Sequence, residues 1–318
     1  MAAAQTPARP VYLIDASIYI FQAHFSPYVD CVSRRGDDLG ALYGFTRFLL
    51  QFLARTGADT LAVAHDESLF CGFRHELCPD YKSNRELPDA SLARQLKACF
   101  TVCEVLGLAA YASRRYEADD IIGVLAGRVR RTRNPRSVQI VSRDKDLAQL
   151  LSSPDDVLWD YQGDRRRRRD DIQAELGILP EQVPDYLGLV GDAVDCIAGV
   201  PGIGPVKGRL LLQRFHSLEG LYDNLDAVSE MPFRGAPRVA EQLAAYEDRA
   251  VLGKRLATIV GRLDDDNETF ARSGVRLLRR RQVAQADLQA FLAEYDFDRE
   301  TTARLLRLAE RAAEETHR

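Results

Sequence analysis

Short apolar runs that end in an acidic residue recur along this chain, and they limit its possible folds more than any other feature. Val11-Tyr12-Leu13-Ile14 is followed by Asp15, and the run at residues 60–65 is followed by Asp66. Each run has the length of a buried strand, and helical patterns separate the runs. This alternation predicts a parallel sheet, in which all strand carboxyl ends lie on one edge. We therefore expect these acids to gather there.

Two further strand-like runs lead into acids in the same way. Residues 138–141 precede Asp144 and Asp146, and residues 108–111 precede the stretch Glu117-Ala118-Asp119-Asp120, which opens an apolar helical run. A simpler interpretation exists for each acid, because carboxylates often cap a helix or complement the positive end of its dipole. Their recurrence at strand ends favours a common site.

From about residue 172 the pattern becomes helical throughout. Residues 184–190 form one predicted helix, and Asp192 and Asp195 follow it. The segment Gly199-Val200-Pro201-Gly202-Ile203-Gly204-Pro205 predicts a tight turn with a proline at the start of the next helix. Free backbone N–H groups at such a start can hold a phosphate.

Composition excludes several classes of protein. The 318 residues carry a net charge of −4, so no global positive field marks a nucleic-acid binder. The sequence shows no secretory leader and no apolar run long enough to span a membrane. The six cysteines lack zinc-binding spacing, and no disulfide framework is expected. These features predict a cytoplasmic protein without a membrane partner.

Basic residues are concentrated in two places. The stretches Phe73-Arg74-His75-Glu76 and Tyr81-Lys82-Ser83-Asn84-Arg85 suit phosphate contacts and stacking on a base, although a solvated loop would look the same. Residues 165–169 are five consecutive arginines. They predict either a solvated hairpin tip or a contact with a nucleic-acid backbone.

A cluster of carboxylates needs neutralisation. Two bare carboxylates about 4 Å apart repel by about 4 kcal/mol at an effective dielectric constant of 20. Several such pairs would exceed the stability of a domain, about 5–15 kcal/mol. Oxygen ligands select hard cations, so the predicted cofactors are two Mg²⁺ or Mn²⁺ ions, the arrangement used in phosphodiester hydrolysis.

The motifs that carry these acids closely resemble the 5′ nuclease (flap endonuclease) family, which includes the 5′–3′ exonuclease domain of bacterial DNA polymerase I and its stand-alone relatives. The resemblance extends over residues 11–225. It rests on Leu13-Ile14-Asp15, Phe73-Arg74-His75-Glu76, Tyr81-Lys82, Tyr116-Glu117-Ala118-Asp119-Asp120, Asp144-Lys145-Asp146-Leu147, Gly191-Asp192-x-x-Asp195 and the glycine-rich turn that follows.

The resemblance implies a role for each matching residue. The first metal would be held by Asp15, Asp66, Glu117 and Asp119. The second would be held by Asp144, Asp146 and Asp192, with Asp119 bridging both ions and Asp120 and Asp195 acting as outer acids. Lys82 and Arg85 would steer the scissile phosphate onto the metals and share in catalysis. Arg74 would bind phosphate, and Tyr81 would stack on the terminal base.

The glycine-rich turn resembles the helix-hairpin-helix of the family, which binds DNA and a K⁺ ion. The DNA contacts would come from Gly202, Gly204 and Lys207. The backbone carbonyls on K⁺ would be those of Leu189, Val190, Ala198, Val200 and Ile203. The chain departs from the family at Gln22, where an arginine is usual, and in the turn, which reads Cys196-Ile197-Ala198-Gly199 and Gly204-Pro205-Val206-Lys207-Gly208.

The expected architecture is an α/β nuclease domain of PIN-like, 5′ nuclease fold, with a mostly parallel sheet, at residues 11–172. It has a helical arch at about residues 67–95, and residues 1–10 form a flexible N-terminus. A helical domain follows at residues 173–318, with its hairpin at about residues 184–215.

The expected function is metal-dependent 5′–3′ exonuclease and flap endonuclease activity on DNA with 5′ flaps or free 5′ ends, in bacterial replication or repair. A monomer at the nucleoid is expected, with functional links to a DNA polymerase and a ligase. The alternatives are a catalytically weak flap-binding protein of the same fold and a PIN-type ribonuclease. A complete set of acids argues against the first alternative, and the hairpin argues against the second.

Overall fold

The computed structural model describes residues 9–263 and 267–316, and the chain divides into two compact units. Unit 1 comprises residues 1–67, 87–142 and 261–318, and unit 2 comprises residues 68–86 and 143–260. Most of the N-terminal segment that the sequence analysis sets apart, residues 1–8, lies outside the described residues. None of the helices in the described ranges is long and apolar enough to cross a membrane.

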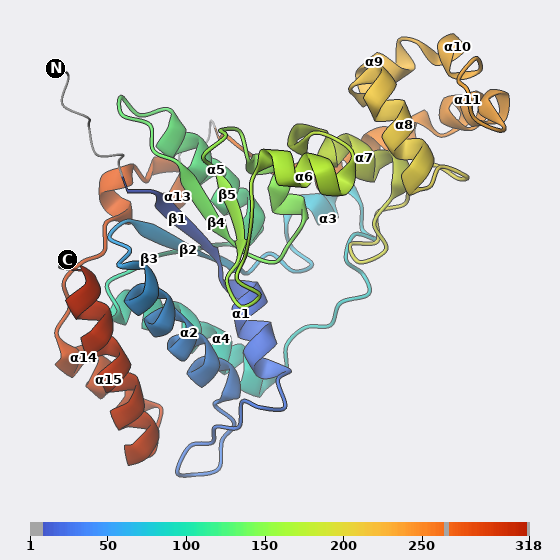
Figure 1. Ribbon diagram of the computed structural model, residues 1–318. Coiled ribbons are helices and arrows are strands. Elements are labelled where there is room, and N and C mark those ends of the chain that lie inside the picture. The colour runs from blue at the N-terminus through green and yellow to red at the C-terminus, as the bar shows by residue number, and fades with distance from the viewer. Residues whose placement is uncertain (1–8, 264–266, 317–318) are drawn as a thin grey trace, which may run out of the picture. The chain divides into compact units, whose positions relative to one another are not determined.

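Unit 1 is a layered α/β structure (Figure 1). Its elements are β1 (Val11–Asp15), α1 (Ala16–His24), α2 (Gly40–Thr56), β2 (Leu61–Asp66), α4 (Ala90–Val105), β3 (Ala109–Ser113), α5 (Ala118–Arg130), β4 (Val138–Val141), α13 (Thr269–Arg272), the 3-10 helix η3 (Val275–Leu278), α14 (Gln285–Glu294) and α15 (Arg299–Thr316). The four strands are parallel and lie in the order β3-β2-β1-β4. The predicted parallel sheet is confirmed.

The sheet of unit 1 is covered on both faces, which explains why its strands read as continuous apolar runs. Helices α2 and α4 lie on one face, with α14 and α15 packed on them, and α5 lies on the other face with α13 packed on it (Figure 1). The strand order places the topological switch between β1 and β4, because the chain moves outward through β2 and β3 and then returns to the other side of β1. Ligands of open α/β sheets bind at the carboxyl ends of the strands beside such a switch.

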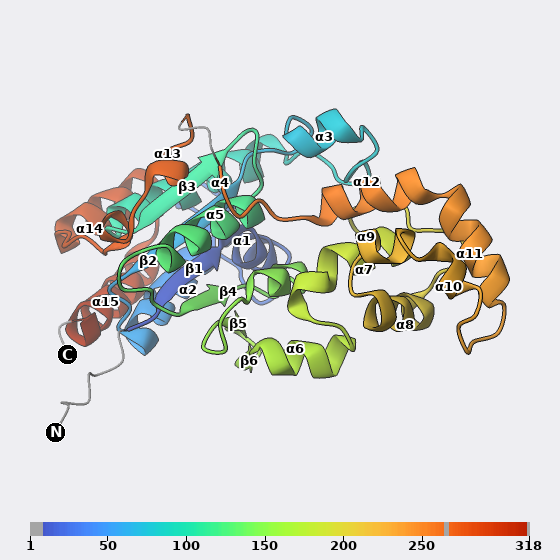
Figure 2. The ribbon, with the colours of Figure 1, turned by 90° about the horizontal axis from the view of Figure 1, so that it is seen from above.

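Unit 2 is mainly helical (Figure 2). Its elements are α3 (Phe73–Leu77), the 3-10 helices η1 (Asp146–Leu150) and η2 (Pro180–Gln182), β5 (Val157–Asp160), β6 (Arg165–Arg167), α6 (Arg169–Leu176), α7 (Val183–Val190), α8 (Pro205–Phe215), α9 (Leu218–Tyr222), α10 (Leu225–Val228), α11 (Ala236–Ala245) and α12 (Glu247–Ala257). Buried Leu187, Leu211, Leu218 and Leu243 belong to one core. Helices α7 and α12 approach at the backbone, since a Cβ on Gly188 would lie 2.6 Å from the carbonyl oxygen of Ala250.

The two compact units divide the chain differently from the predicted domains. The prediction places residues 261–318 in the helical domain, whereas they belong to unit 1, where α14 packs on α4 and α15 packs on α2. The physical reason is that α2 and α4 need cover on the side away from the sheet. The predicted arch is also divided, since residues 68–86 belong to unit 2 and contain only the short helix α3.

We predict that Leu305→Ala destabilises unit 1. Leu305 is fully buried on α15, so removing its side chain leaves a cavity that costs about 2–5 kcal/mol. Hydrogen exchange of the β1 and β2 amides should speed up, and urea unfolding should shift to lower concentration. The exposed Glu314→Ala on the same helix is the control. Unchanged exchange in the sheet would contradict the assignment of α15 to unit 1.

Candidate functional site

Two acids mark the carboxyl edge of the unit 1 sheet beside the topological switch. Asp15 ends β1, pairs in register with Ala64 of β2 and is 4% exposed. Asp66 ends β2, pairs in register with Ser113 of β3 and is exposed. Across the switch, the hydroxyl of Ser142 donates to Asp15 Oδ2 at 2.8 Å. The predicted position of these acids at a strand edge is therefore confirmed.

Two helix N-termini converge on the same edge. The backbone N–H of Ser17 in α1 donates to Asp15 Oδ1 at 3.1 Å, and the hydroxyl of Ser17 donates to Asp66 Oδ2 at 3.0 Å. The backbone N–H of Ala118 in α5 donates to Asp66 Oδ1 at 2.7 Å. These donors and the positive ends of both helices stabilise negative charge at the edge. Sequence reasoning missed Ser17 and Ser142, which carry no signal except their places next to Asp15 and β4.

The sequence left two roles open for the acids at the start of α5, helix capping and membership of a common site. The three acids of this stretch differ in their surroundings. Asp120 is fully buried, and its Oδ2 accepts from the backbone N–H of Glu117 at 3.0 Å. Asp120 thus has the capping role of the simpler interpretation. Asp119 is half-buried in the first helical turn, and Glu117 is 9% exposed at the N-cap. The second role expected for Asp120, as an outer acid, stays a prediction.

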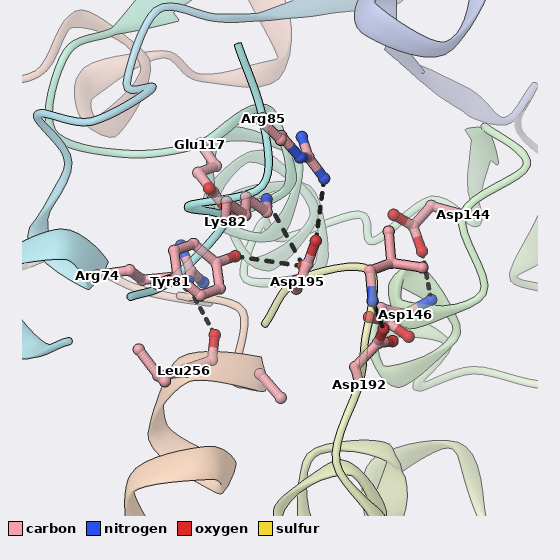
Figure 3. A network of polar contacts seen from close by, with 12 residues as sticks. Arg74, Tyr81, Lys82, Arg85, Glu117, Asp144, Asp146, Asp192, Asp195 and Leu256 are labelled. Carbon is pink, nitrogen blue, oxygen red and sulfur yellow. Dashed lines mark hydrogen bonds and ion pairs between the residues drawn. The ribbon is translucent and has the colours of Figure 1, made fainter. Parts of the chain in front are cut away.

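Unit 2 holds a second group of acids, Asp144, Asp146 and Asp192 (Figure 3), and Lys145 contacts two of them. Lys145 Nζ lies 3.1 Å from Asp146 Oδ1 and 2.8 Å from Asp192 Oδ2. Asp144 Oδ1 accepts from the backbone N–H of Asp146 at 2.8 Å. Asp192 follows α7, and a two-residue antiparallel bridge to Ile197 fixes its backbone. A positive charge thus lies between the carboxylates of Asp146 and Asp192.

These contacts shift the pKa values of the two carboxyl groups in opposite directions. Burial and the charge of Asp144 raise the pKa of Asp146 to about 7, although Lys145 opposes the shift. Burial would also raise the pKa of Asp192, but the hydrogen bond and charge of Lys145 outweigh it and lower that pKa below its usual value. Burial would lower the pKa of Lys145, but the charges of Asp146 and Asp192 outweigh it and raise that pKa. The sequence motif predicts no role for Lys145, and its contacts with both carboxylates are visible only in the structure.

A third group joins Asp195 to the basic loop of unit 2 (Figure 3). Asp195 accepts from Tyr81 at 3.4 Å, lies 2.9 Å from Arg85 Nη2 and lies 3.7 Å from Lys82 Nζ. The backbone N–H of Lys82 also donates to the carbonyl of Asp195. Lys82 has φ of 51°, a left-handed conformation that such contacts must hold in place. The basic pair predicted to bind phosphate is thus held together by one carboxylate.

Other predicted DNA contacts have structural partners in unit 2. Arg74 is buried and donates to the carbonyls of Leu256 and Thr258 at 2.7 and 2.9 Å. Tyr81 is 2% exposed, which leaves its ring inaccessible to a base in this structure. These positions give no support to phosphate binding by Arg74 or to stacking by Tyr81. Both residues help to fix the loop that carries Lys82.

The arginines at 165–169 also have partners inside unit 2. Arg165 and Arg167 form ion pairs with Glu175 at 2.6 and 3.6 Å, and Arg166 lies over the Trp159 ring. Three of the five belong to strand β6, which is antiparallel to β5, so they are not at a hairpin tip. The expectation of a tip is corrected, because the turn is formed by the residues between the strands.

The predicted hairpin is formed by α7 and α8. The segments at Gly191 and Gly199 cross at the backbone, since a Cβ on Gly199 would lie 2.3 Å from the carbonyl carbon of Val190. The carbonyls of Leu189 and Val200 accept backbone hydrogen bonds, and Lys207 Nζ donates to the carbonyl of Gly202 at 3.0 Å. Gly204 is the N-cap of α8. The expected contacts of Gly202, Gly204 and Lys207 with DNA, and K⁺ binding by the carbonyls of Leu189, Val190, Ala198, Val200 and Ile203, stay predictions.

The donor chemistry fits divalent cations, although the acids alone do not enclose one. Within residues 9–263 and 267–316, no three acid, histidine or cysteine side chains are gathered closely enough to form a metal cage. All candidate donors are carboxylates, which suit Mg²⁺ and Mn²⁺. In this structure Lys145 already supplies a positive charge to Asp146 and Asp192. A cation and Lys145 would compete there.

The fold and the acids define a class of protein in which a layered α/β unit carries acids at the carboxyl edge of a parallel sheet and is joined in sequence to a helical unit. Profiles of two domains match the chain: "5′-3′ exonuclease, N-terminal resolvase-like domain" at residues 10–179, and "5′-3′ exonuclease, C-terminal SAM fold" at residues 178–273. The chain belongs to the 5′–3′ exonuclease family, and it is accordingly a nuclease that hydrolyses DNA. The boundary between the profiles lies close to the one expected from sequence, whereas the compact units divide the chain differently.

Curated relatives support this membership. A 5′–3′ exonuclease of Buchnera aphidicola is 32% identical over 254 residues, covering 80% of this chain and 87% of the relative. DNA polymerase I of Pseudomonas aeruginosa is 34% identical over 251 residues, covering 79% of this chain and 27% of the polymerase. The match therefore covers most of the exonuclease but only about a quarter of the polymerase.

Solved structures with similar folds extend over nearly the whole chain. The T5 5′-exonuclease with bound zinc has a TM-score of 0.61 at 19% identity, covering 96% of this chain and 100% of that chain. The catalytic core of Rad2 in complex with DNA substrate has a TM-score of 0.60 at 13% identity, covering 95% and 94%. At these identities the likeness establishes the fold, and the expected 5′ nuclease architecture is confirmed.

We predict that the metal-free protein loses stability as the pH rises through the range in which Asp146 titrates. A folded-state pKa of about 7 means that, between about pH 4 and 7, the folded protein binds a proton that the unfolded chain has released. The contribution of this group to the unfolding free energy therefore falls with rising pH, by up to about 1.4 kcal/mol per pH unit. Asp146→Asn should remove this fall.

The measurement is urea unfolding in a chelator at pH 5, 6, 7 and 8. The stability of Asp146→Asn relative to the parent should increase from pH 5 to pH 8, and the exposed Asp170→Asn should show no such trend. Parallel pH profiles for Asp146→Asn and the parent would contradict the shifted pKa.

Proposed function

We propose that this protein is a structure-specific 5′ nuclease that uses two divalent cations to hydrolyse DNA phosphodiesters at 5′ flaps and free 5′ ends. One observation carries the proposal: in a member of the 5′–3′ exonuclease family, Asp15 and Asp66 lie at the carboxyl edge of a parallel sheet, at the topological switch. The helix N-termini and hydroxyls that stabilise this edge prepare it for charged ligands.

The proposed ligands fall into the two acid groups. Asp15, Asp66, Glu117 and Asp119 of unit 1 would hold one cation, and Asp144, Asp146 and Asp192 of unit 2 would hold the other. Asp119 is also the residue proposed to bridge the ions. Bound Mg²⁺ or Mn²⁺ ions supply a water of lowered pKa and stabilise the charge on the attacking and leaving oxygens.

The residues of the chain itself have three tasks in this proposal. The α1 and α5 N–H groups and Ser142 orient the carboxylates of unit 1. Lys145 offsets the negative charge of the half-buried Asp146 and Asp192. Lys82 and Arg85 attract the scissile phosphate, which would compete with Asp195 for their donors. Asp195 would act as an outer acid through this pair.

The proposed substrate and metal requirement draw on the structural neighbours. The Rad2 core is known in complex with DNA substrate, and the T5 enzyme with divalent metal ions. We extend DNA binding and a divalent-metal requirement to this chain. A monomer that works in the bacterial cytoplasm at the nucleoid, during replication or repair and together with a DNA polymerase and a ligase, suits the proposed substrate. A flap-binding protein with weak catalysis is the alternative, and the completeness of the acid set argues against it.

The decisive assay incubates the purified protein with 5′-labelled flap DNA, with and without Mg²⁺. A short labelled product that depends on Mg²⁺ and on the free 5′ end is expected. DNA binding without such a product would favour the flap-binding alternative.

We predict that Asp119→Ala abolishes cleavage while flap binding survives. The side chain is at the first turn of α5 and is proposed to ligate both cations, so its removal should lower the single-turnover rate by at least about a hundredfold. Binding of the flap should be measured in Ca²⁺ by fluorescence anisotropy. The exposed Asp170→Asn serves as the control. Retained cleavage by Asp119→Ala would overturn its proposed role.

We predict that Gln22→Arg lowers the Michaelis constant for flap DNA. Gln22 is half-buried on α1, and its Oε1 has no hydrogen-bond partner in the structure. An arginine at this position would add the phosphate contact that the family usually has there. Gln22→Ala controls for loss of the amide. A Michaelis constant equal to that of the parent would show that the missing contact is supplied elsewhere in the chain.

A further inference from the structure

Helices α2 and α15 of unit 1 pack side by side (Figure 1). Residues of both helices line a basic hollow. Its volume is about 390 Å³. Its lining includes four arginines, one tyrosine and one glutamine, and no carboxylate: Arg47, Arg304, Arg307, Arg311, Tyr43 and Gln51. None of these residues belongs to the acid groups or to the basic loop described above.

The helical spacing of these residues explains the hollow. Tyr43, Arg47 and Gln51 follow one another at four-residue intervals on α2, and Arg304, Arg307 and Arg311 occupy one face of α15. With a rise of about 1.5 Å per residue, the three α15 arginines extend over about 10 Å. The hollow thus presents a row of positive charges rather than one isolated charge.

Tyr43 organises two of the arginines. The guanidinium of Arg47 lies 5.4 Å from the centre of its ring, and Arg304 Nη1 donates to its hydroxyl at 3.2 Å. Arg304 also pairs with Glu300 on its own helix at 3.0 Å, and Glu300 does not line the hollow. The tyrosine therefore helps to hold two guanidinium groups at the wall of the hollow.

We propose that this hollow binds backbone phosphates of a nucleic-acid strand, at a site separate from the acid groups. Arginine forks match phosphate oxygens in a bidentate manner. A row about 10 Å long suits successive phosphates, since neighbouring nucleotides on a strand rise by about 3.4 Å. Leu308 is the one aliphatic residue of the lining, which offers little area for the apolar face of a peptide helix.

This inference rests on the proposed function, because it supplies a second grip on the same DNA substrate. Contacts to phosphates fix position and add affinity without reading sequence. The site should therefore contribute to binding and to its salt dependence. The rate of the chemical step at saturating DNA should not depend on it.

The test uses the full chain and flap DNA in a chelator, with affinity measured at several salt concentrations. The double variant Arg307→Gln, Arg311→Gln should bind more weakly and reduce the slope of log affinity against log salt by about 1.8, or about 0.9 for each lost phosphate contact. The matched control is Arg276→Gln, Arg299→Gln, which removes two exposed arginines of unit 1 outside the hollow. It should leave the slope unchanged.

Three outcomes would overturn the proposal. The first is a slope that is the same in both double variants. The second is that millimolar dAMP or inorganic phosphate protects the parent, but not the Arg307/Arg311 double variant, against thermal unfolding, while the two proteins have the same affinity for DNA. That result would assign the hollow to a small anion. The third is a changed affinity for polyglutamate with unchanged DNA affinity, which would assign it to an acidic peptide.

A failure of the proposed phosphate site can be distinguished from a failure of the proposed nuclease function. The Mg²⁺ cleavage assay is run on the same three proteins at saturating DNA. If the Arg307/Arg311 double variant cleaves at the parental rate and has the parental salt slope, the proposed phosphate site is wrong and the proposed nuclease function stands. A parent that binds DNA with a slope that depends on Arg307 and Arg311, but never cleaves, would remove the nuclease proposal and leave the phosphate site.

Discussion

Repulsion between carboxylates is the constraint on which the rest of this structure depends. A parallel sheet brings the ends of its strands to one edge, so acids at those ends come together whether or not their charges are compensated. Unit 1 compensates with N–H groups and positive helix ends at Asp15 and Asp66. Unit 2 compensates with ammonium and guanidinium groups, Lys145 for Asp146 and Asp192, and Arg85 for Asp195. Each of these acids therefore has a donor or a cation beside it that offsets its negative charge.

The sequence predicts most of the fold because the signals that specify strands are local. The predicted strands at residues 11–14, 60–65 and 138–141 agree with β1, β2 and β4 to within about one residue at each end. The placement of residues 261–318 could not be predicted this way. Their helical pattern shows that they have an apolar face but not which element it covers, and the answer lies in contacts with α2 and α4 that are distant in sequence.

The candidate site is predictable to a similar degree and for a similar reason. The positions of Asp15 and Asp66 follow from strand ends alone. The roles of Tyr81 and Arg74 do not, because a basic and aromatic stretch looks the same whether it faces solvent or packs inward, and here both side chains are buried. The arginine run shows the same limit: Glu175 and Trp159 hold three of its members, whereas the scattered Arg47, Arg307 and Arg311 share one hollow.

Unit 1 is built from three separate stretches of the chain, and this affects the order in which the two units can fold during synthesis. The ribosome releases β1 to β4 early, and then all of residues 143–260, before the residues that cover α2 and α4 are synthesised. Domains made earlier generally fold first. Unit 2 can therefore complete its core while the helical layer of unit 1 still exposes apolar surface. During that interval the uncovered surface of α2 and α4 is the part of unit 1 most prone to aggregation, until α14 and α15 are translated and pack on it.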